Sequence, residues 1–135
     1  MAVPSQLAAS VYVALGGGTG AVLRYQAGRL MTTWLGPERI TAFPWGTMSI
    51  NVTGSVLMGV VAGILARHGE GGEFWRLLVG IGVLGGFTTF SSFSLELVLL
   101  IERQAYAPAV AYALGSVLAG AIGLWLGLAA TRAIG

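Results

Sequence analysis

The sequence contains no cysteine, no lysine and no aspartate, and only 9% of its 135 residues are charged. Without cysteine the chain cannot form disulfides, thiolate metal sites or thiol nucleophiles. It also has a single histidine, so most nucleophile–base and metal constellations cannot be assembled, and we do not expect an enzyme. The net charge of +2 comes from scattered arginines, which at the ends of apolar segments more often reach toward lipid headgroups than bind nucleic acid. We therefore expect no nucleic-acid partner.

Long apolar runs take the place of the missing charges. Hydrophobic residues make up 56% of the chain, and the four charge-free stretches are 1–23, 40–66, 77–95 and 104–131. Each stretch holds roughly the 20 residues that an α-helix needs to cross about 30 Å of hydrocarbon. We predict an all-α, multi-pass membrane protein that forms a single domain over residues 1–135. The four transmembrane helices are expected at approximately 7–31, 45–66, 75–103 and 106–131.

The arginines are shared almost evenly between the two sides of the membrane that four spans define. Cytoplasmic loops normally carry an excess of Lys and Arg, and this bias orients a membrane protein. A near-tie leaves two explanations open: a weakly oriented protein, or dual topology, in which copies insert both ways up and pair as an antiparallel homodimer. Arg24, if it is counted, makes the balance three against four. The arginines compared are Arg67, Arg76 and Arg132 on the side of the termini, and Arg29, Arg39 and Arg103 on the other.

Polar residues within the first two predicted helices are candidates for function. Asn51 lies near the middle of the second helix, and Thr47 is one turn earlier on the same face. An amide in hydrocarbon needs partners, so Asn51 could either join two helices or face a polar pathway. In the first helix, Gly16 and Gly20 form a G-x-x-x-G packing pattern ahead of Arg24. Arg24 could anchor that helix at the membrane interface or supply positive charge to a vestibule.

The third predicted helix has an unusual composition. Its four glycines, which end with Gly85 and Gly86, precede five hydroxyl residues within the seven positions from Thr88 to Ser94. Such a sequence is typical of a place where a transmembrane helix breaks, and irregular backbone at membrane depth is tolerated only when it is buried in protein or lines a cavity. We therefore predict a third helix that is broken mid-membrane. Freed carbonyls there could coordinate a cation, and freed amides and hydroxyls could bind an anion.

Aromatic residues are interleaved with these hydroxyls. Phe87, Phe90 and Phe93 recur every three residues, which predicts that they share one helix face. A stripe of this kind usually faces lipid or core. The flanking serines favour a second interpretation, in which the positive edges of the rings line an anion path. In the fourth helix, Tyr112 and Ser116 share one face, and Tyr112 could border the same path.

At these motifs the sequence resembles the Fluc, or CrcB-type, family of fluoride channels. The resemblance covers essentially the whole chain, and its specific strings are Gly17 to Tyr25, Trp45 to Asn51 and Gly85 to Glu96. It implies passive fluoride export across the inner (plasma) membrane by an antiparallel, dual-topology homodimer with two pathways. Because the family often has threonine where Ser92 stands, the resemblance implies that the hydroxyl is kept and a methyl group is lost.

The resemblance also implies a role for each candidate residue. Backbone carbonyls of Gly85 and Thr88 from both subunits would hold one structural sodium ion at the dimer interface. Arg24 would serve a vestibule, and Glu96 would lie at a pathway end. The residues implied along the fluoride pathway are Asn51, Phe90 and Phe93, with polar contacts from Thr47, Ser91, Ser92, Tyr112 and Ser116.

Two other functions are compatible with four short spans. A proton-coupled exporter of the small multidrug-resistance type needs a carboxylate within the membrane to exchange protons for a cationic drug. Residues 1–23 contain no acidic residue, and only Glu96 and Glu102 lie near a predicted span, which argues against an exporter. A non-transporting assembly subunit would leave the hydroxyl and aromatic residues of the third helix unexplained.

Overall fold

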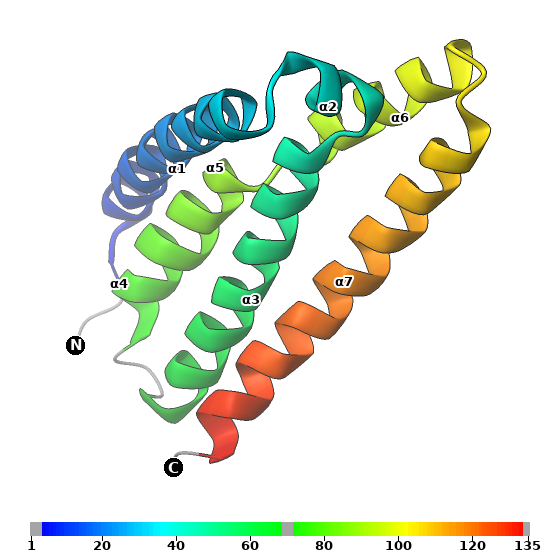
Figure 1. The fold of residues 1–135 in the computed structure, drawn as a ribbon. Helices are drawn as coiled ribbons and strands as arrows, with labels where there is room; N and C mark the ends of the chain where they lie inside the picture. Colours follow the sequence, from blue (N-terminus) through cyan, green and yellow to red (C-terminus); the bar gives the residue numbers. More distant parts are fainter. Residues whose placement is uncertain (1–3, 69–71, 134–135) are drawn as a thin grey trace.

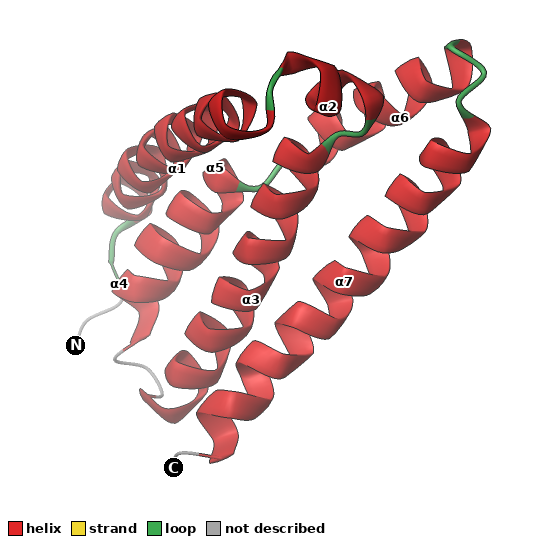
Figure 2. Ribbon diagram, in the orientation of Figure 1, coloured by secondary structure: helices red, strands yellow, loops and turns green. Residues whose placement is uncertain are grey.

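The computed structural model describes residues 4–68 and 72–133, and every regular element in these ranges is helical (Figure 2). Residues 1–3, 69–71 and 134–135 of the predicted domain lie outside the described residues. Four helical segments are long and apolar enough to cross a membrane, which confirms the predicted all-α membrane protein. These four spans are Gln6–Leu35, Trp45–Arg67, Glu73–Glu102 and Tyr106–Ala133.

The first span is α1 (Gln6–Leu35), which ends four residues later than expected. Its N-cap is Ser5, whose side chain accepts the N–H of Ala8 at 3.3 Å. It ends at Gly36, where a φ of 81° favours a residue without Cβ. The connection to the second span contains the short helix α2 (Pro37–Ala42), which has proline in its first turn.

The second and fourth spans are the continuous helices α3 (Trp45–His68) and α7 (Tyr106–Ala133). The third span is divided into α4 (Glu73–Trp75), the π-helical segment η2 (Arg76–Leu84), α5 (Gly85–Phe87) and α6 (Phe90–Glu102). Thr88 and Thr89 separate α5 from α6, and both have extended backbone, with ψ of 156° and 119°. The predicted break in the third helix is therefore confirmed, at these two threonines.

Close backbone contacts between small residues hold the spans together. Figure 1 shows the first half of the third span between α1 and α3, with α7 on the far side of α3. A Cβ atom added to Gly16 or Gly20 of α1 would overlap carbonyl oxygens of η2. A Cβ atom added to Gly59 of α3 would overlap the backbone of α7, and one added to Gly127 of α7 would overlap the backbone of α3. The G-x-x-x-G pattern thus marks the seam between α1 and the third span.

Candidate functional site: the break in the third span

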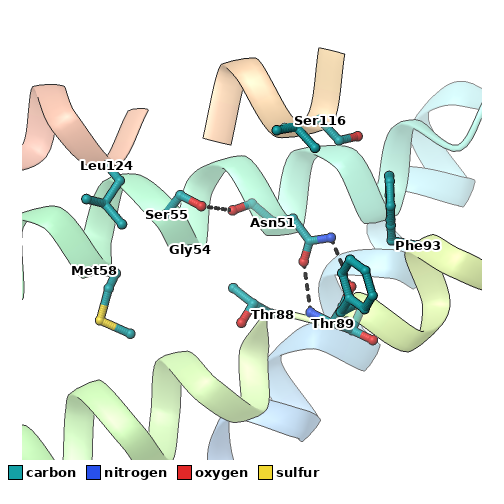
Figure 3. Close-up of a pocket in the computed structure, with 11 residues that line it drawn as sticks. Asn51, Gly54, Ser55, Met58, Thr88, Thr89, Phe93, Ser116 and Leu124 are labelled. Carbon is teal, nitrogen blue, oxygen red and sulfur yellow. Dashed lines mark hydrogen bonds between the residues drawn. The ribbon is translucent and has the colours of Figure 1, made fainter. Parts of the chain in front are cut away.

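Asn51 of α3 spans the break through both ends of its side-chain amide. Its Nδ2 donates to the carbonyl oxygen of Thr89 at 3.0 Å, and its Oδ1 accepts the Thr89 N–H at 2.8 Å (Figure 3). Thr89 has extended backbone between α5 and α6, and this one side chain binds both of its backbone polar groups at the break. The second Nδ2 hydrogen of Asn51 is left over from this pair and can serve another acceptor.

Thr89 is the residue that the sequence analysis missed. Its hydroxyl oxygen accepts the N–H of Ser92 at 3.2 Å and so caps the N-terminus of α6. The same oxygen lies 3.2 Å from the hydroxyls of Ser91 and of Ser92. The sequence did contain a signal for this role. A threonine directly before a predicted helix is a common N-cap residue, because its hydroxyl can accept a backbone N–H of the first turn.

Two cavities meet at Thr89. The first, of about 310 Å³, is lined by residues of the second, third and fourth spans, among them Asn51, Phe90 and Ser116. The second, of about 600 Å³, opens beside α1 and the start of α3. Thr89 lines both of them. The break is therefore flanked by open space on two sides.

The first cavity contains the predicted aromatic residues and one unpaired hydroxyl. Phe90 and Phe93 lie with ring centroids 5.6 Å apart, and Phe90 is 79% exposed in the single chain. Across from them on α7, the Ser116 Oγ is buried without a hydrogen-bond partner among the described residues. Phe87 belongs to α5, so the expected single face of Phe87, Phe90 and Phe93 is wrong, because the break reorients the chain between the first two rings.

The second cavity brings Arg24, Thr47, Ser92 and Glu96 together. The Arg24 Nε donates to the carbonyl oxygen of Gly86 at 3.2 Å, so this side chain reaches the last turn before the break. The guanidinium thereby adds positive charge next to the carbonyl end of the half-helix, where cations are favoured. Arg24 is thus both a cavity residue and a partner of the interrupted backbone.

Glu96 is bound by two hydroxyl groups within the membrane-spanning part of the chain. The Thr47 Oγ1 donates to Oε1 at 2.8 Å, and the Tyr112 hydroxyl donates to Oε2 at 2.6 Å. Tyr112 is completely buried, and its ring lies 5.0 Å from that of Phe93. Tyr112 lines neither cavity but connects Glu96, beside the second cavity, to Phe93, beside the first.

The remaining predicted residues lie nearby with different surroundings. Ser91 is exposed and lines neither cavity, although its hydroxyl is within reach of Thr89. Hydrogen bonds at the break engage the carbonyl oxygens of Leu84, Gly86 and Thr89. Gly85 opens α5 and Thr88 is its C-cap residue, so the two carbonyls implied as sodium ligands belong to the last turn before the break. No group of three His, Cys, Asp or Glu residues that could hold a metal occurs in the described ranges 4–68 and 72–133.

The family model described as CrcB-like protein, Camphor Resistance (CrcB), matches residues 11–128. The chain belongs to the CrcB family. The residues of the break, of both cavities and of the Glu96 hydrogen bonds all lie inside the matched segment, so these features are parts of the CrcB domain.

Several curated CrcB-type relatives are similar over nearly their full length. The fluoride-specific ion channel FluC of Novosphingobium aromaticivorans is 59% identical over 128 residues, which cover 95% of this chain and 99% of that protein. The FluC proteins of Erythrobacter litoralis and Phenylobacterium zucineum are 53% and 50% identical over 127 residues. These alignments cover 93% of this chain in both cases, and 93% and 97% of the two relatives.

Proposed function

We propose that this CrcB protein is a fluoride-selective channel, in which the ion passes the broken third span along the polar groups of α3, α6 and α7. The observation that carries this proposal is the position of Thr89, which borders both cavities and is fixed by Asn51. The relatives named as fluoride-specific ion channels support the same ion. The function is transport without covalent chemistry.

The chemistry suits a small, strongly hydrated anion. A pore must replace the water of fluoride with donors at close range, and the sites must stay weak enough for the ion to leave. The free Nδ2 hydrogen of Asn51 and the unpaired Ser116 hydroxyl are such donors. The ring edges of Phe90 and Phe93 add weak positive potential without a full charge. We assign Ser92, Thr47 and Tyr112 to polar contacts on the same route, and Ser91 to its edge.

Arg24 and Glu96 mark the entry from the second cavity. The guanidinium of Arg24 raises the local concentration of anions at the mouth of a low-dielectric cleft. The Glu96 carboxylate accepts two hydroxyl hydrogen bonds, so its negative charge is stabilised beside the route rather than left facing the ion. We infer that fluoride moves passively outward across the inner (plasma) membrane, helped by roughly 2.3 kcal/mol per 100 mV of negative-inside potential.

We propose further that the working unit is an antiparallel homodimer. The near-even arginine distribution supports insertion in both orientations, and the large exposed ring of Phe90 supports a second chain beside α6. Two added arginines on one side should fix one orientation. Activity should then return only when the oppositely biased variant is co-expressed, and full activity from one fixed orientation would contradict the dimer.

The carbonyls of Gly85 and Thr88 are our candidate ligands for a structural sodium ion. Carbonyl oxygens of irregular transmembrane backbone are suitable ligands for Na⁺. Two chains would supply four of them, which lets one ion join the breaks of both subunits.

Ion flux from liposomes tests the function directly. Purified protein is reconstituted, and efflux is followed with fluoride and chloride electrodes. We expect rapid fluoride release with no release of chloride. Drug–proton exchange in place of fluoride release would instead support the exporter, which the CrcB relatives do not favour.

A further inference from the structure

The connection between the first two spans directs one aromatic side chain back into the bundle. Phe43 follows α2, and its own N–H donates to the carbonyl of Arg39 at 3.0 Å. Its carbonyl accepts the N–H of Trp45 at 2.8 Å, across the buried Pro44. The backbone of Phe43 is therefore fixed on both sides, and proline restricts it further. This loop residue has little freedom to move its ring away.

The ring of Phe43 packs against Tyr112 of α7. The two ring centroids are 5.6 Å apart and the planes meet at 80°, the favourable edge-to-face geometry. Phe43 also packs on a buried cluster formed by Leu100, Ala109 and Tyr112, as does Phe93. The Tyr112 ring is thus contacted by one aromatic from the loop and by one from the pathway.

A second contact fastens the same connection. Arg103, just after α6, donates from Nη1 to the carbonyl oxygen of Thr41 in α2 at 3.0 Å. Its Nε donates to the carbonyl of Leu99 at 3.1 Å. Figure 1 shows α2 close to α6 at this end of the bundle. The loop is therefore attached to the third span as well as to the fourth.

We propose that Phe43 is a positioning residue for permeation, which acts by holding the Tyr112 hydroxyl on the Glu96 carboxylate. The hydrogen bond from Tyr112 is 2.6 Å long and lies at the far end of a long, rigid side chain. A ring tilt of about 15° moves a tyrosine hydroxyl by roughly 1.5 Å, which is enough to lose a hydrogen bond. This inference rests on the proposed function, because it takes Tyr112 and Glu96 as parts of the fluoride route.

A double-mutant cycle on fluoride efflux tests the proposal. The variants are Phe43→Leu, Tyr112→Phe and the combination, each compared with the parent at equal amounts of reconstituted protein. Tyr112→Phe keeps the ring and removes the hydroxyl, and we expect it to slow efflux about ten- to a hundredfold, the effect of one lost hydrogen bond to a charged group. Phe43→Leu should slow efflux by a similar factor. In the Tyr112→Phe background it should change nothing further.

Phe74→Leu is the matched control. Phe74 makes the same kind of edge-to-face contact with Tyr12, at 4.9 Å and 83°, far from Glu96. This control removes an equivalent aromatic pair and should leave efflux unchanged. If Phe43→Leu fails to give folded protein, Phe43→Met keeps the apolar volume, loses the ring edge and carries the same expectation.

The outcomes distinguish the positioning role of Phe43 from the proposed channel function. Equal slowing by Phe43→Leu in both backgrounds, or no slowing in either, overturns the positioning role of Phe43. Unchanged efflux in Tyr112→Phe overturns it too, and also removes Tyr112 from the proposed route. An absence of fluoride efflux in the parent protein would refute the proposed function itself.

Discussion

Asn51 holds the break through its two hydrogen bonds to the backbone of Thr89, which we call the clamp. Replacing Asn51 by leucine removes the clamp while preserving the size of the side chain. Leucine cannot accept the Thr89 N–H or donate to the Thr89 carbonyl, which Asn51 binds at 2.8 and 3.0 Å. It also removes the free amide hydrogen that we assign to fluoride. One substitution therefore affects the stability of the break and the chemistry of the route.

The expected cost follows from the groups left behind. Side-chain hydrogen bonds between membrane helices contribute about 0.6 kcal/mol on average and rarely more than about 1.7 kcal/mol. Unsatisfied buried backbone groups cost about 1–3 kcal/mol each. Thr89 is only half-buried and borders two cavities, so water can partly replace the amide. We expect Asn51→Leu to destabilise the protein by about 1–3 kcal/mol, which lowers the apparent melting temperature by roughly 3–15 °C for a chain of this size.

Thermal unfolding of the purified protein, read beside fluoride efflux from liposomes, measures both effects. Ser55→Ala is the matched stability control, because Ser55 lies one turn later on α3 and donates only to the backbone carbonyl of Asn51 at 2.8 Å. The control should lower the melting temperature by less than about 2 °C. In Asn51→Leu, efflux should fall more than about tenfold, because no donor replaces the amide.

A melting temperature for Asn51→Leu that equals that of Ser55→Ala would refute the clamp. Normal efflux at a lowered melting temperature would instead refute the donor role of Asn51. The structural role of Asn51 and its donor role are therefore tested separately.

Three further predictions address other parts of the site. Arg24→Gln should slow efflux about two- to tenfold at low ionic strength and less at high salt, whereas Arg24→Lys should keep most of the rate, as measured by electrode at both salt concentrations. Phe90→Ile and Phe93→Ile should slow efflux while the elution volume in size-exclusion chromatography stays that of the parent protein, and unchanged flux in both would exclude the ring edges. Exchange of sodium for a large organic cation during purification should lower the melting temperature if the Gly85 and Thr88 carbonyls hold Na⁺, and full stability without sodium would exclude that site.

Hydropathy and local composition were enough to predict the spans and the break. The spans follow from charge-free runs of sufficient length, and the break follows from Gly85 and Gly86 ahead of two threonines. Both signals are local, so they do not depend on knowing the neighbouring helices. For Asn51, the sequence left two roles open, which were joining two helices and facing a polar pathway. Its contact with Thr89 is a joining contact that leaves one hydrogen for the second role.

Contacts between distant residues could not be predicted from the sequence. Thr88 and Thr89 are neighbouring residues of the same type, so the sequence does not show which of them Asn51 binds. The choice of Thr89 depends on the position of Asn51, which is 38 residues away. Glu96 was placed at a pathway end, but its partners Thr47 and Tyr112 come from two other helices. The π-helical segment before the break had no sequence signal that we identified.

Glycines around the break explain how its geometry can be specific for one small ion. A Cβ atom on Gly54 of α3 would overlap the methyl group of Thr88, and one on Gly86 would overlap the backbone of Gly17 in α1. A Cβ atom on Gly20 would overlap backbone atoms of the last turns before the break. Beside the hydrogen bonds of Asn51, close contacts of the backbone therefore help to fix the break, and such contacts have fewer alternative arrangements than contacts between flexible side chains. A rigid break keeps its donors at set positions, and set positions are what a site needs to replace the water around fluoride without collapsing onto it.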